Sequence, residues 1–416
     1  MEVKPGYKQT EVGVIPQEWD VKPLQSVLSK GRLGGNYPNQ NRESEFPLMK
    51  MGNIARGHFD ISKVEFITPG VTPESQHRLV YGDVLFNTRN TLELVGKVAI
   101  WRDELSVAYY NSNLMRLEFG EVWSNEYANY ALNTAGSVAR LRALATGTTS
   151  VAAIYTRDLM GLLFVVPPTR EQRAIAATLS DVDALLAGLD RFIAKKRDLK
   201  HAVMQQLLTA QTRLPGFHGE WEVKRVLELG DVVTGGTPRT DVAEYWGGKY
   251  PWVTPTDISA HRDMSSSERW LTRKGLDAVR SLPPNSVLVT CIASIGKNAI
   301  LSVRGACNQQ INAVIPNRSS DPVFLYYLFE ASKQYLLANA GTTATSMISK
   351  AAFSELTFRV PKLDEQTAIA AVLSDIDAEL SMLEARRGKT RALKQGMMQE
   401  LLTGRTRLVP VGGAHA

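Results

Sequence analysis

The chain has 416 residues, which is enough for two or three domains, and its 44% hydrophobic and 22% charged residues are ordinary for a globular protein. It lacks any run of about 18 apolar residues or the apolar core of a signal peptide, which argues against a membrane protein and predicts a cytoplasmic one. The formal net charge of +6 favours a polyanionic partner, and nucleic acid is the first candidate.

Residues 1–165 form the first expected globular domain. A polar, turn-rich lead-in from Gly6 to Trp19 is followed by short apolar runs that Gly, Pro, Asn and Asp separate, a pattern typical of strands joined by turns. The runs lie at 46–49, 83–86, 96–100 and 114–117. Residues 126–144 have helical spacing, so the sequence predicts a mixed α/β domain.

Residues 166–214 contain a long predicted helix of about 40 residues, or about 60 Å at 1.5 Å per residue. Thr169 and Gln172 have the spacing of a capping box after two prolines. An apolar stripe then steps by four and three residues, as in a helix packed on another helix. Its members are Ile175, Leu179, Val182, Leu186, Leu189 and Ile193. We expect the stripe to shift to Leu199, Val203 and Leu207, because the charged Lys196 and Lys200 cannot be buried in an apolar interface between two helices.

Residues 215–359 repeat the plan of the first domain, residues 360–408 repeat the helix, and residues 409–416 form a short tail. The helical copies align without a gap at a constant offset (365 − 171 = 407 − 213 = 194), and about half of the aligned positions are identical. Asp364 is expected to cap the second helix. The stripe continues there through Leu373, Leu380 and Leu393.

The two globular domains match more loosely than the helices. Gly147-Thr148-Thr149 returns as Gly341-Thr342-Thr343, where we expect a tight turn, and Gly96-Lys97 returns as Gly296-Lys297. Near-identity in the helices beside divergence in the domains implies that the helices perform one task twice and the domains two different tasks.

The sequence contains none of the catalytic signatures sought. A P-loop, a Gly-rich S-adenosylmethionine loop, Gly-x-Ser-x-Gly and His-Glu-x-x-His are absent. Cys291 and Cys307 lie in apolar runs without neighbours at zinc-ligand spacing, so we expect buried thiols and no metal site. The chain is therefore expected not to be an enzyme.

Two copies of a variable domain, each followed by a Glu-Gln-x-x-Ile-Ala-x-x-Leu-Ser helix, resemble the DNA specificity subunit of type I restriction-modification enzymes. The residues that carry the resemblance are Pro167-Pro168, Glu171-Gln172, Ile175-Ala176, Leu179-Ser180 and Asp183, with Pro361, Glu365-Gln366, Ile369-Ala370, Leu373-Ser374 and Asp377. The Gly-Thr-Thr motifs and Gly13-Val14-Ile15-Pro16-x-x-Trp19 fit the same pattern, so the resemblance covers almost the whole chain.

The resemblance implies an α+β fold with two target-recognition domains joined by two long antiparallel, coiled-coil-like helices around a pseudo-twofold axis. It implies double-stranded DNA as a partner, together with two modification subunits and restriction subunits. S-adenosylmethionine, ATP and Mg²⁺ would bind to those subunits and not to this chain. Helices of about 60 Å correspond to at most about 18 base pairs of unread spacer between two different half-sites.

Candidate DNA contacts are polar side chains in turns beside the strand-like runs, since Arg and Lys pair with guanine and Asn with adenine. In the first domain they are Lys50, Asn53, Arg56, Arg89, Asn90 and Lys97. In the second domain they are Arg239, Thr254, Thr256, Lys297, Asn298, Gln309 and Gln310. Each could equally be an ordinary solvated or turn-capping residue. Trp101, Trp252 and Tyr109 are expected in the core.

The two helices carry basic stretches at equivalent places, in which Lys196 and Lys200 are candidates for phosphate contacts; a solvated helix face is the alternative. Apolar helix residues are candidates for contact with other subunits. They are Leu179, Leu186, Met204, Leu208, Leu373, Leu380, Met398 and Leu402. A coiled-coil adaptor whose domains bind proteins remains a second hypothesis, and an independent nuclease or methyltransferase is a third that the missing motifs disfavour.

Overall fold

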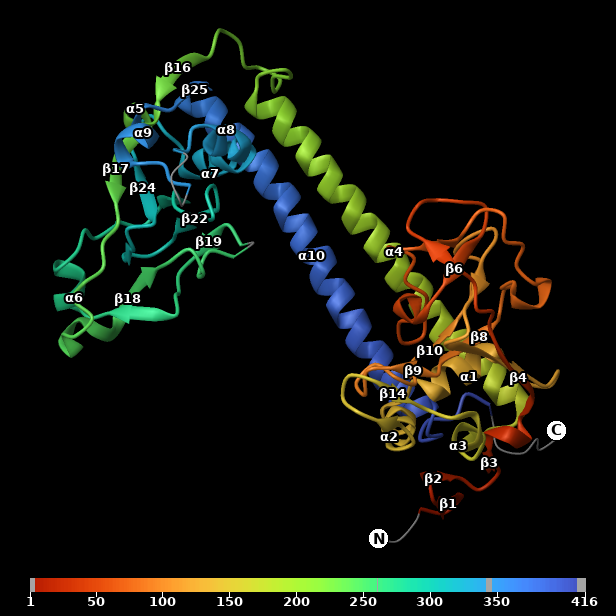
Figure 1. Ribbon diagram of the computed structural model, residues 1–416. Helices are drawn as coiled ribbons and strands as arrows, with labels where there is room; N and C mark the ends of the chain where they lie inside the picture. The colour runs from red at the N-terminus through yellow and green to blue at the C-terminus, as the bar shows by residue number, and fades with distance from the viewer. Residues whose placement is uncertain (1–3, 260, 342–345, 410–416) are drawn as a thin grey trace. The chain divides into compact units, whose positions relative to one another are not determined.

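The computed structural model describes residues 4–259, 261–341 and 346–409. The chain divides into two compact units, Met1–Leu189 with Arg386–Ala416 (unit 1) and Asp190–Ala385 (unit 2). Each unit therefore combines one globular domain with part of both long helices. These helices are α4 (Thr169–Leu208) and α10 (Leu363–Leu401) (Figure 1). Their lengths of 40 and 39 residues agree with the predicted length.

Unit 1 is built on a four-stranded antiparallel sheet with the order β10-β8-β12-β4. A second sheet has the order β11-β6-β7-β5, and β9 joins the hairpin β13-β14. The strands are β1 (Tyr7–Thr10), β2 (Gly13–Pro16), β3 (Asp20–Pro23), β4 (Leu28–Leu33), β5 (Asn39–Gln40), β6 (Pro47–Met49), β7 (Glu65–Ile67), β8 (Val84–Asn87), β9 (Arg89–Asn90), β10 (Val98–Ile100), β11 (Tyr109–Tyr110), β12 (Leu114–Phe119), β13 (Thr146–Gly147), β14 (Ala152–Ala153) and β15 (Leu163–Val166).

The helices of unit 1 before α4 are short. They are α1 (Asn125–Leu132), α2 (Ala135–Ala143) and α3 (Thr156–Met160), with 3-10 turns at Leu24–Ser26, Met51–Asn53 and Ser75–His77. The single helix expected over residues 126–144 is in fact two, because the Thr134 hydroxyl caps a new helix by accepting from the Ser137 N–H.

Unit 2 repeats this topology. Its main sheet has the order β17-β24-β21-β22-β19, in which the first four strands correspond to β4, β12, β8 and β10 of unit 1. The second sheet, β20-β18-β23, matches β7-β6-β11, and the pair β16-β25 matches β3-β15. Both domains thus share one fold, as the weak repeat predicted.

The strands of unit 2 are β16 (Glu222–Arg225), β17 (Gly230–Thr234), β18 (Trp246–Val253), β19 (Asp263–Met264), β20 (Arg269–Leu271), β21 (Ser286–Thr290), β22 (Asn298–Leu301), β23 (Ala306–Cys307), β24 (Ile311–Pro316) and β25 (Thr357–Val360). Its helices before α10 are α5 (Val226–Leu229), α6 (Arg273–Asp277), α7 (Pro322–Ala331), α8 (Lys333–Ala338) and α9 (Lys350–Glu355), with a 3-10 turn at Ala243–Tyr245. Figure 1 shows α5, α7, α8 and α9 gathered near the beginning of α10.

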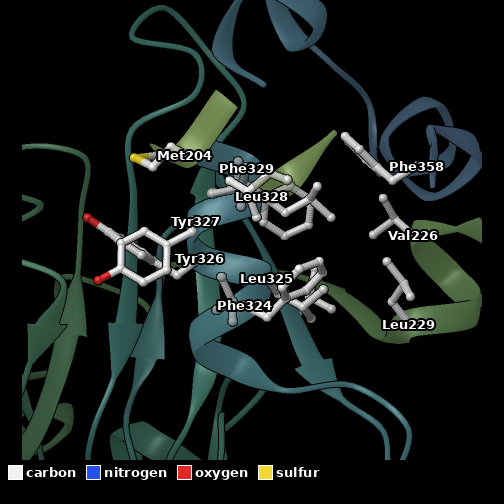
Figure 2. Close-up of a cluster of buried hydrophobic side chains, with 14 of the residues drawn as sticks. Met204, Val226, Leu229, Phe324, Leu325, Tyr326, Tyr327, Leu328, Phe329 and Phe358 are labelled. Atoms are coloured by element: carbon white, nitrogen blue, oxygen red, sulfur yellow. The ribbon is translucent and has the colours of Figure 1, made fainter. Parts of the chain in front are cut away.

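The core of unit 2 joins its main sheet to both long helices. Figure 2 shows aromatic and aliphatic side chains of α7 packed with Met204 of α4, residues of α5 and Phe358 of β25. Helix α7 begins with Pro322 at its first turn, and the Asp321 carboxylate accepts the next two backbone N–H groups. This helix therefore anchors the sheet to the helical pair.

Several smaller predictions are confirmed. Trp101, Trp252 and Tyr109 are buried, and so are the free thiols of Cys291 and Cys307. Burial raises the pKa of Cys291 to about 11. Gly147 ends β13 and leads into the predicted tight turn, in which the Thr148 N–H donates to the Val151 carbonyl at 2.9 Å. The φ of Gly147 is +125°, and an added Cβ would lie 2.3 Å from the same carbonyl oxygen. In the second copy, Thr342 and Thr343 lie outside the described residues.

The predicted helix caps are wrong. Thr169 is the first residue of α4 and Asp364 lies inside the first turn of α10, so neither precedes its helix. The Gln172 amide instead donates to the Pro167 carbonyl (2.9 Å) and accepts the Ser124 N–H (3.3 Å). It therefore ties the start of α4 to α1.

Candidate nucleic-acid interface

The Glu-Gln motif at the start of each long helix holds its unit together. In unit 1, both carboxylate oxygens of Glu171 accept from Arg407 at 2.6 Å, and Trp19 Nε1 donates to Glu171 at 3.0 Å. In unit 2, Glu365 accepts from Arg213 at 2.5 and 2.7 Å. The segment that follows one helix thus returns to the first turn of the other, so α4 and α10 are antiparallel within each unit.

A second repeated contact fastens each domain to the helices. Lys200 Nζ lies 2.6 Å from Asp377, whose carboxylate also accepts the Tyr327 hydroxyl at 2.6 Å. The equivalent group in unit 1 has Lys394 at 2.5 Å from Asp183, which accepts from Tyr130 at 2.7 Å. Each lysine also lies over the tyrosine ring, at 5.5 Å and 5.3 Å. The internal symmetry therefore extends to individual contacts.

These contacts correct the predicted apolar stripe. The side chains of Lys196 and Lys200 are only 19% exposed, and they pair with Glu379 and Asp377 of α10. Of the residues expected to continue the stripe, Leu207 is buried and Val203 packs against the core, as predicted, but Leu199 is 48% exposed. Its counterpart Leu393 is 60% exposed. The seam keeps its register because facing carboxylates neutralise the lysines while their methylene stems fill the space. Phosphate contact by Lys196 and Lys200 stays a prediction, although both ammonium groups already have acidic partners.

The apolar residues proposed for contact with other subunits lie inside their own units. Leu179 and Leu373 are 0% exposed. The remaining members pack in or against the same two cores or are half-buried. They are Leu186, Met204, Leu208, Leu380, Met398 and Leu402. Most of them offer little surface to a partner, because the hydrophobic cores of the two units already cover them.

In unit 1, two of the predicted contact residues make internal contacts. Lys50 forms an ion pair with Glu65 at 2.9 Å. Asn53 is 5% exposed: its oxygen accepts the Lys50 N–H, and its amide donates to the carbonyls of Asp60 and Lys63. Its role in the structure is to hold a turn.

The other candidates of unit 1 are more accessible. Arg89 is exposed on β9, Lys97 is half-buried before β10, and the Asn90 side chain accepts the N–H of the next residue. Arg56 is half-buried, and its Nη1 is buried without a hydrogen-bond partner among the described residues. Burial lowers the pKa of the Arg56 guanidinium, and the charge of Arg142 lowers it further.

In unit 2, three predicted side chains are held by neighbours. Asn298 is 4% exposed and donates to the Tyr326 carbonyl, which makes it part of the core. The Thr254 hydroxyl donates to Asp257 at 2.6 Å, and Gln310 accepts from Asn308 at 2.9 Å.

The remaining residues of this set are exposed. Lys297 precedes β22, Thr256 lies 2.8 Å from the Thr254 hydroxyl, and Gln309 accepts from the Thr237 hydroxyl at 2.7 Å. Arg239 is exposed and pairs with Asp241 at 2.7 Å. DNA contact by these residues, and by Arg89, Asn90 and Lys97, stays a prediction.

Sequence reasoning missed Arg140 and Arg142 on α2. They lie in a stretch, residues 127–157, that contains no Asp or Glu, which is a signal visible without a structure. It also missed Arg269, whose guanidinium lies 3.6 Å from the Trp246 ring centroid and 5.4 Å from that of Trp252. Nothing in the local sequence indicated that stack, because the two tryptophans are on β18 and the arginine is on β20.

The described helices include none with the length and apolar character of a membrane span. Within the same part of the chain, His, Cys, Asp and Glu residues form no group of three or more that could hold a metal.

Comparison with known proteins gives consistent matches. Residues 218–390 match the type I restriction modification DNA specificity domain. The chain is 24% identical to the type I restriction enzyme MjaX specificity subunit of Methanocaldococcus jannaschii over 97% of both chains. It is 34% identical to the MjaIX specificity subunit of the same organism over 38% of each chain. The S subunit of the type I restriction-modification system from M. genitalium has a similar fold, with a TM-score of 0.58, 14% identity, and coverage of 96% of this chain and 98% of that one.

Proposed function

We propose that this chain, which belongs to the family of DNA specificity subunits of type I restriction-modification enzymes, reads a bipartite, asymmetric DNA sequence through its two globular domains. The observation that carries the proposal is the duplicated topology: the sheet order β10-β8-β12-β4 recurs as β22-β21-β24-β17. Two readers of one fold with different surfaces fit two different half-sites. The chain is a recognition subunit and not a catalytic one.

The differences between the paired surfaces support independent reading. Lys50 of unit 1 is paired with Glu65, whereas the corresponding turn of unit 2 holds the hydroxyl pair of Thr254 and Thr256. Lys297 is exposed, and its counterpart Lys97 is half-buried. Because base edges are read by specific donors and acceptors, domains with different polar groups would select different bases.

The helices would carry the other subunits of the complex. Two modification subunits, which would bind S-adenosylmethionine, suit a scaffold with equivalent features on both helices, and restriction subunits would bring ATP and Mg²⁺. Leu199 on α4 and Leu393 on α10 are such equivalent features, exposed by 48% and 60%. Exposed leucines at matched positions fit two copies of one partner better than two unrelated proteins.

A domain exchange tests the proposal. Residues 1–165 are replaced by the same region of a relative, the chimera is co-expressed with its modification subunits, and methylated adenines are mapped across the host genome. We expect one half of the recognised sequence to change and the other half to stay the same. A change in both halves would refute independent reading, and an assembled complex without DNA affinity would favour a protein-binding adaptor.

A further inference from the structure

Unit 1 contains four basic residues on adjoining segments that we call the Arg56 cluster: Arg56, Lys97, Arg140 and Arg142. They come from three segments far apart in sequence, namely the loop after Asn53, the residue before β10, and α2. None of the four forms an ion pair with another described residue. The cluster therefore keeps its positive charge.

Backbone contacts beside these residues bring the three segments together. The Gly57 N–H donates to the Val98 carbonyl at 2.7 Å, and the Asn133 amide donates to the same carbonyl at 3.1 Å. On the other side of Lys97, a Cβ added at Gly96 would lie 3.3 Å from the Cβ of Leu141. The neighbours of all four basic residues are thus in direct contact, and the fold fixes the cluster.

Two arginines of the cluster each have one nitrogen buried without a partner, whereas Arg142 is exposed and donates to the Glu93 carbonyl at 3.2 Å. Arg140 also donates to the Ser137 hydroxyl at 3.2 Å. Arg56 Nη1 and Arg140 Nε are buried and lack a hydrogen-bond partner among the described residues. Burial lowers the pKa of both guanidinium groups, and in Arg56 the charge of Arg142 lowers it further. A buried N–H without an acceptor costs free energy, as does the proximity of two like charges. An anion bound beside Arg142 and the accessible part of Arg56 would offset the repulsion between their charges.

Unit 2 does not repeat this arrangement. At the equivalent glycine, Gly296, the neighbouring side chain is Lys333 of α8, whose Cγ would lie 3.1 Å from an added Cβ. Lys333 pairs with Glu330 at 2.6 Å, so its charge is neutralised within the domain. The uncompensated cluster is a property of unit 1 and not a requirement of the shared fold.

We propose that the Arg56 cluster binds the phosphate backbone of double-stranded DNA. This inference rests on the proposed function and identifies the part of unit 1 that contacts the DNA backbone. Arginine matches phosphate because its planar fork donates two parallel hydrogen bonds. A carboxylate of a partner protein would bring one charge to a cluster of four, whereas a DNA strand brings a phosphate at every nucleotide. Such contacts position the domain without selecting bases.

The test uses the full-length chain co-expressed with its modification subunits and a DNA duplex that carries its recognition sequence. Arg56→Met and Arg142→Met each remove a charge while keeping an apolar stem. Arg157→Met is the matched control, because Arg157 lies in the same unit with a 92% exposed side chain. Affinity is measured at several salt concentrations, on the specific duplex and on a scrambled one.

We expect each cluster variant to weaken binding about 3- to 10-fold and to reduce the slope of log affinity against log salt by about 0.9, equally on both duplexes. The thermal midpoint should stay the same or rise, because a like-charged neighbour is removed. The control should change neither the affinity nor the slope.

An unchanged salt slope in both variants, with wild-type binding intact, would overturn the proposal. So would a weaker affinity accompanied by a lower thermal midpoint, because the arginines would then be structural. Normal DNA binding with failed subunit assembly would assign the cluster to a protein carboxylate instead. If the wild-type complex itself does not bind DNA, the proposed function fails as well, which distinguishes the two failures.

Discussion

Replacing Glu171 with glutamine removes the negative charge that holds Arg407 and Trp19 at the start of α4 in unit 1. The Glu171 side chain is 1% exposed and receives two hydrogen bonds of 2.6 Å from Arg407 and one of 3.0 Å from Trp19. The contact joins the start of α4 to the segment after α10 and to the N-terminal lead-in. Glutamine has nearly the same shape but cannot neutralise the arginine, and its NH2 group faces a donor.

The expected loss is about 3 kcal/mol in the free energy of unfolding, at the lower end of the range for a buried pair that loses one partner. The lower end applies because the Arg407 side chain is 17% exposed and also pairs with Glu18 at 3.1 Å. Water and Glu18 therefore compensate part of the lost attraction.

Urea unfolding followed by tryptophan fluorescence measures this change, and a loss of about 3 kcal/mol would lower the midpoint by about 1 M or more. Glu400→Gln is the matched control: Glu400 belongs to the same unit, its partner Arg405 lies 3.4 Å away, and both side chains are about half exposed. We expect the control variant to lose less than about 1 kcal/mol of unfolding free energy.

A double-mutant cycle completes the test. Glu171→Gln and Arg407→Met should together destabilise the chain by less than the sum of their separate effects, since either change alone leaves an unpaired buried group. If Glu171→Gln lowers the free energy of unfolding by no more than Glu400→Gln does, the Glu171–Arg407 contact does not stabilise unit 1. That result would refute the reasoning.

Three further predictions concern other contacts. Glu365→Gln should cost about 2 kcal/mol, less than the change at Glu171, because Arg213 is 25% exposed; equal losses in urea unfolding would contradict this ordering. Lys200→Met should cost about 1–2 kcal/mol, because it leaves the Asp377 carboxylate without its cation, whereas the exposed Lys195→Met should cost almost nothing in the same assay. Burial lowers the pKa of His77 below 6.5, so its contribution to stability should be complete above pH 6.5 and decline as the pH falls; the decline should be absent in His77→Gln.

The duplicated helices could be predicted from the sequence because their signals are local. Apolar residues at steps of four and three predicted α4 and α10 over nearly their observed lengths, and a gapless offset identified the second copy from the first. Four strands of the first domain, β6, β8, β10 and β12, were found for the same reason, because each is a short apolar run between turn residues. Two-residue strands such as β5, β9 and β13 were not predicted, since they carry no apolar run of their own.

The seam between the helices was predicted only in part: Leu207 is buried as expected, but Leu199 is exposed. Lys196 and Lys200 break the apolar spacing, and the local pattern favours moving the stripe to Leu199. The acids that neutralise them, Glu379 and Asp377, belong to a helix far along the chain. Sequence periodicity describes one helix at a time, whereas burial of a charge depends on what faces it.

The candidate DNA contacts divide in the same way. The sequence placed these candidates in turns beside the strands, but Arg89 and Asn90 form β9 and Asn298 begins β22. Asn53 and Asn298 are buried and make hydrogen bonds within their own domains. The sequence by itself determined the duplication, the long helices and the absence of catalytic motifs. Each can be recognised from the order of residues along the chain, without knowing which segments meet in space. Only the tertiary structure decided which charges are paired and that the segments of Arg56 and Arg142 lie close together, because those relations join parts of the chain that are near each other only after folding.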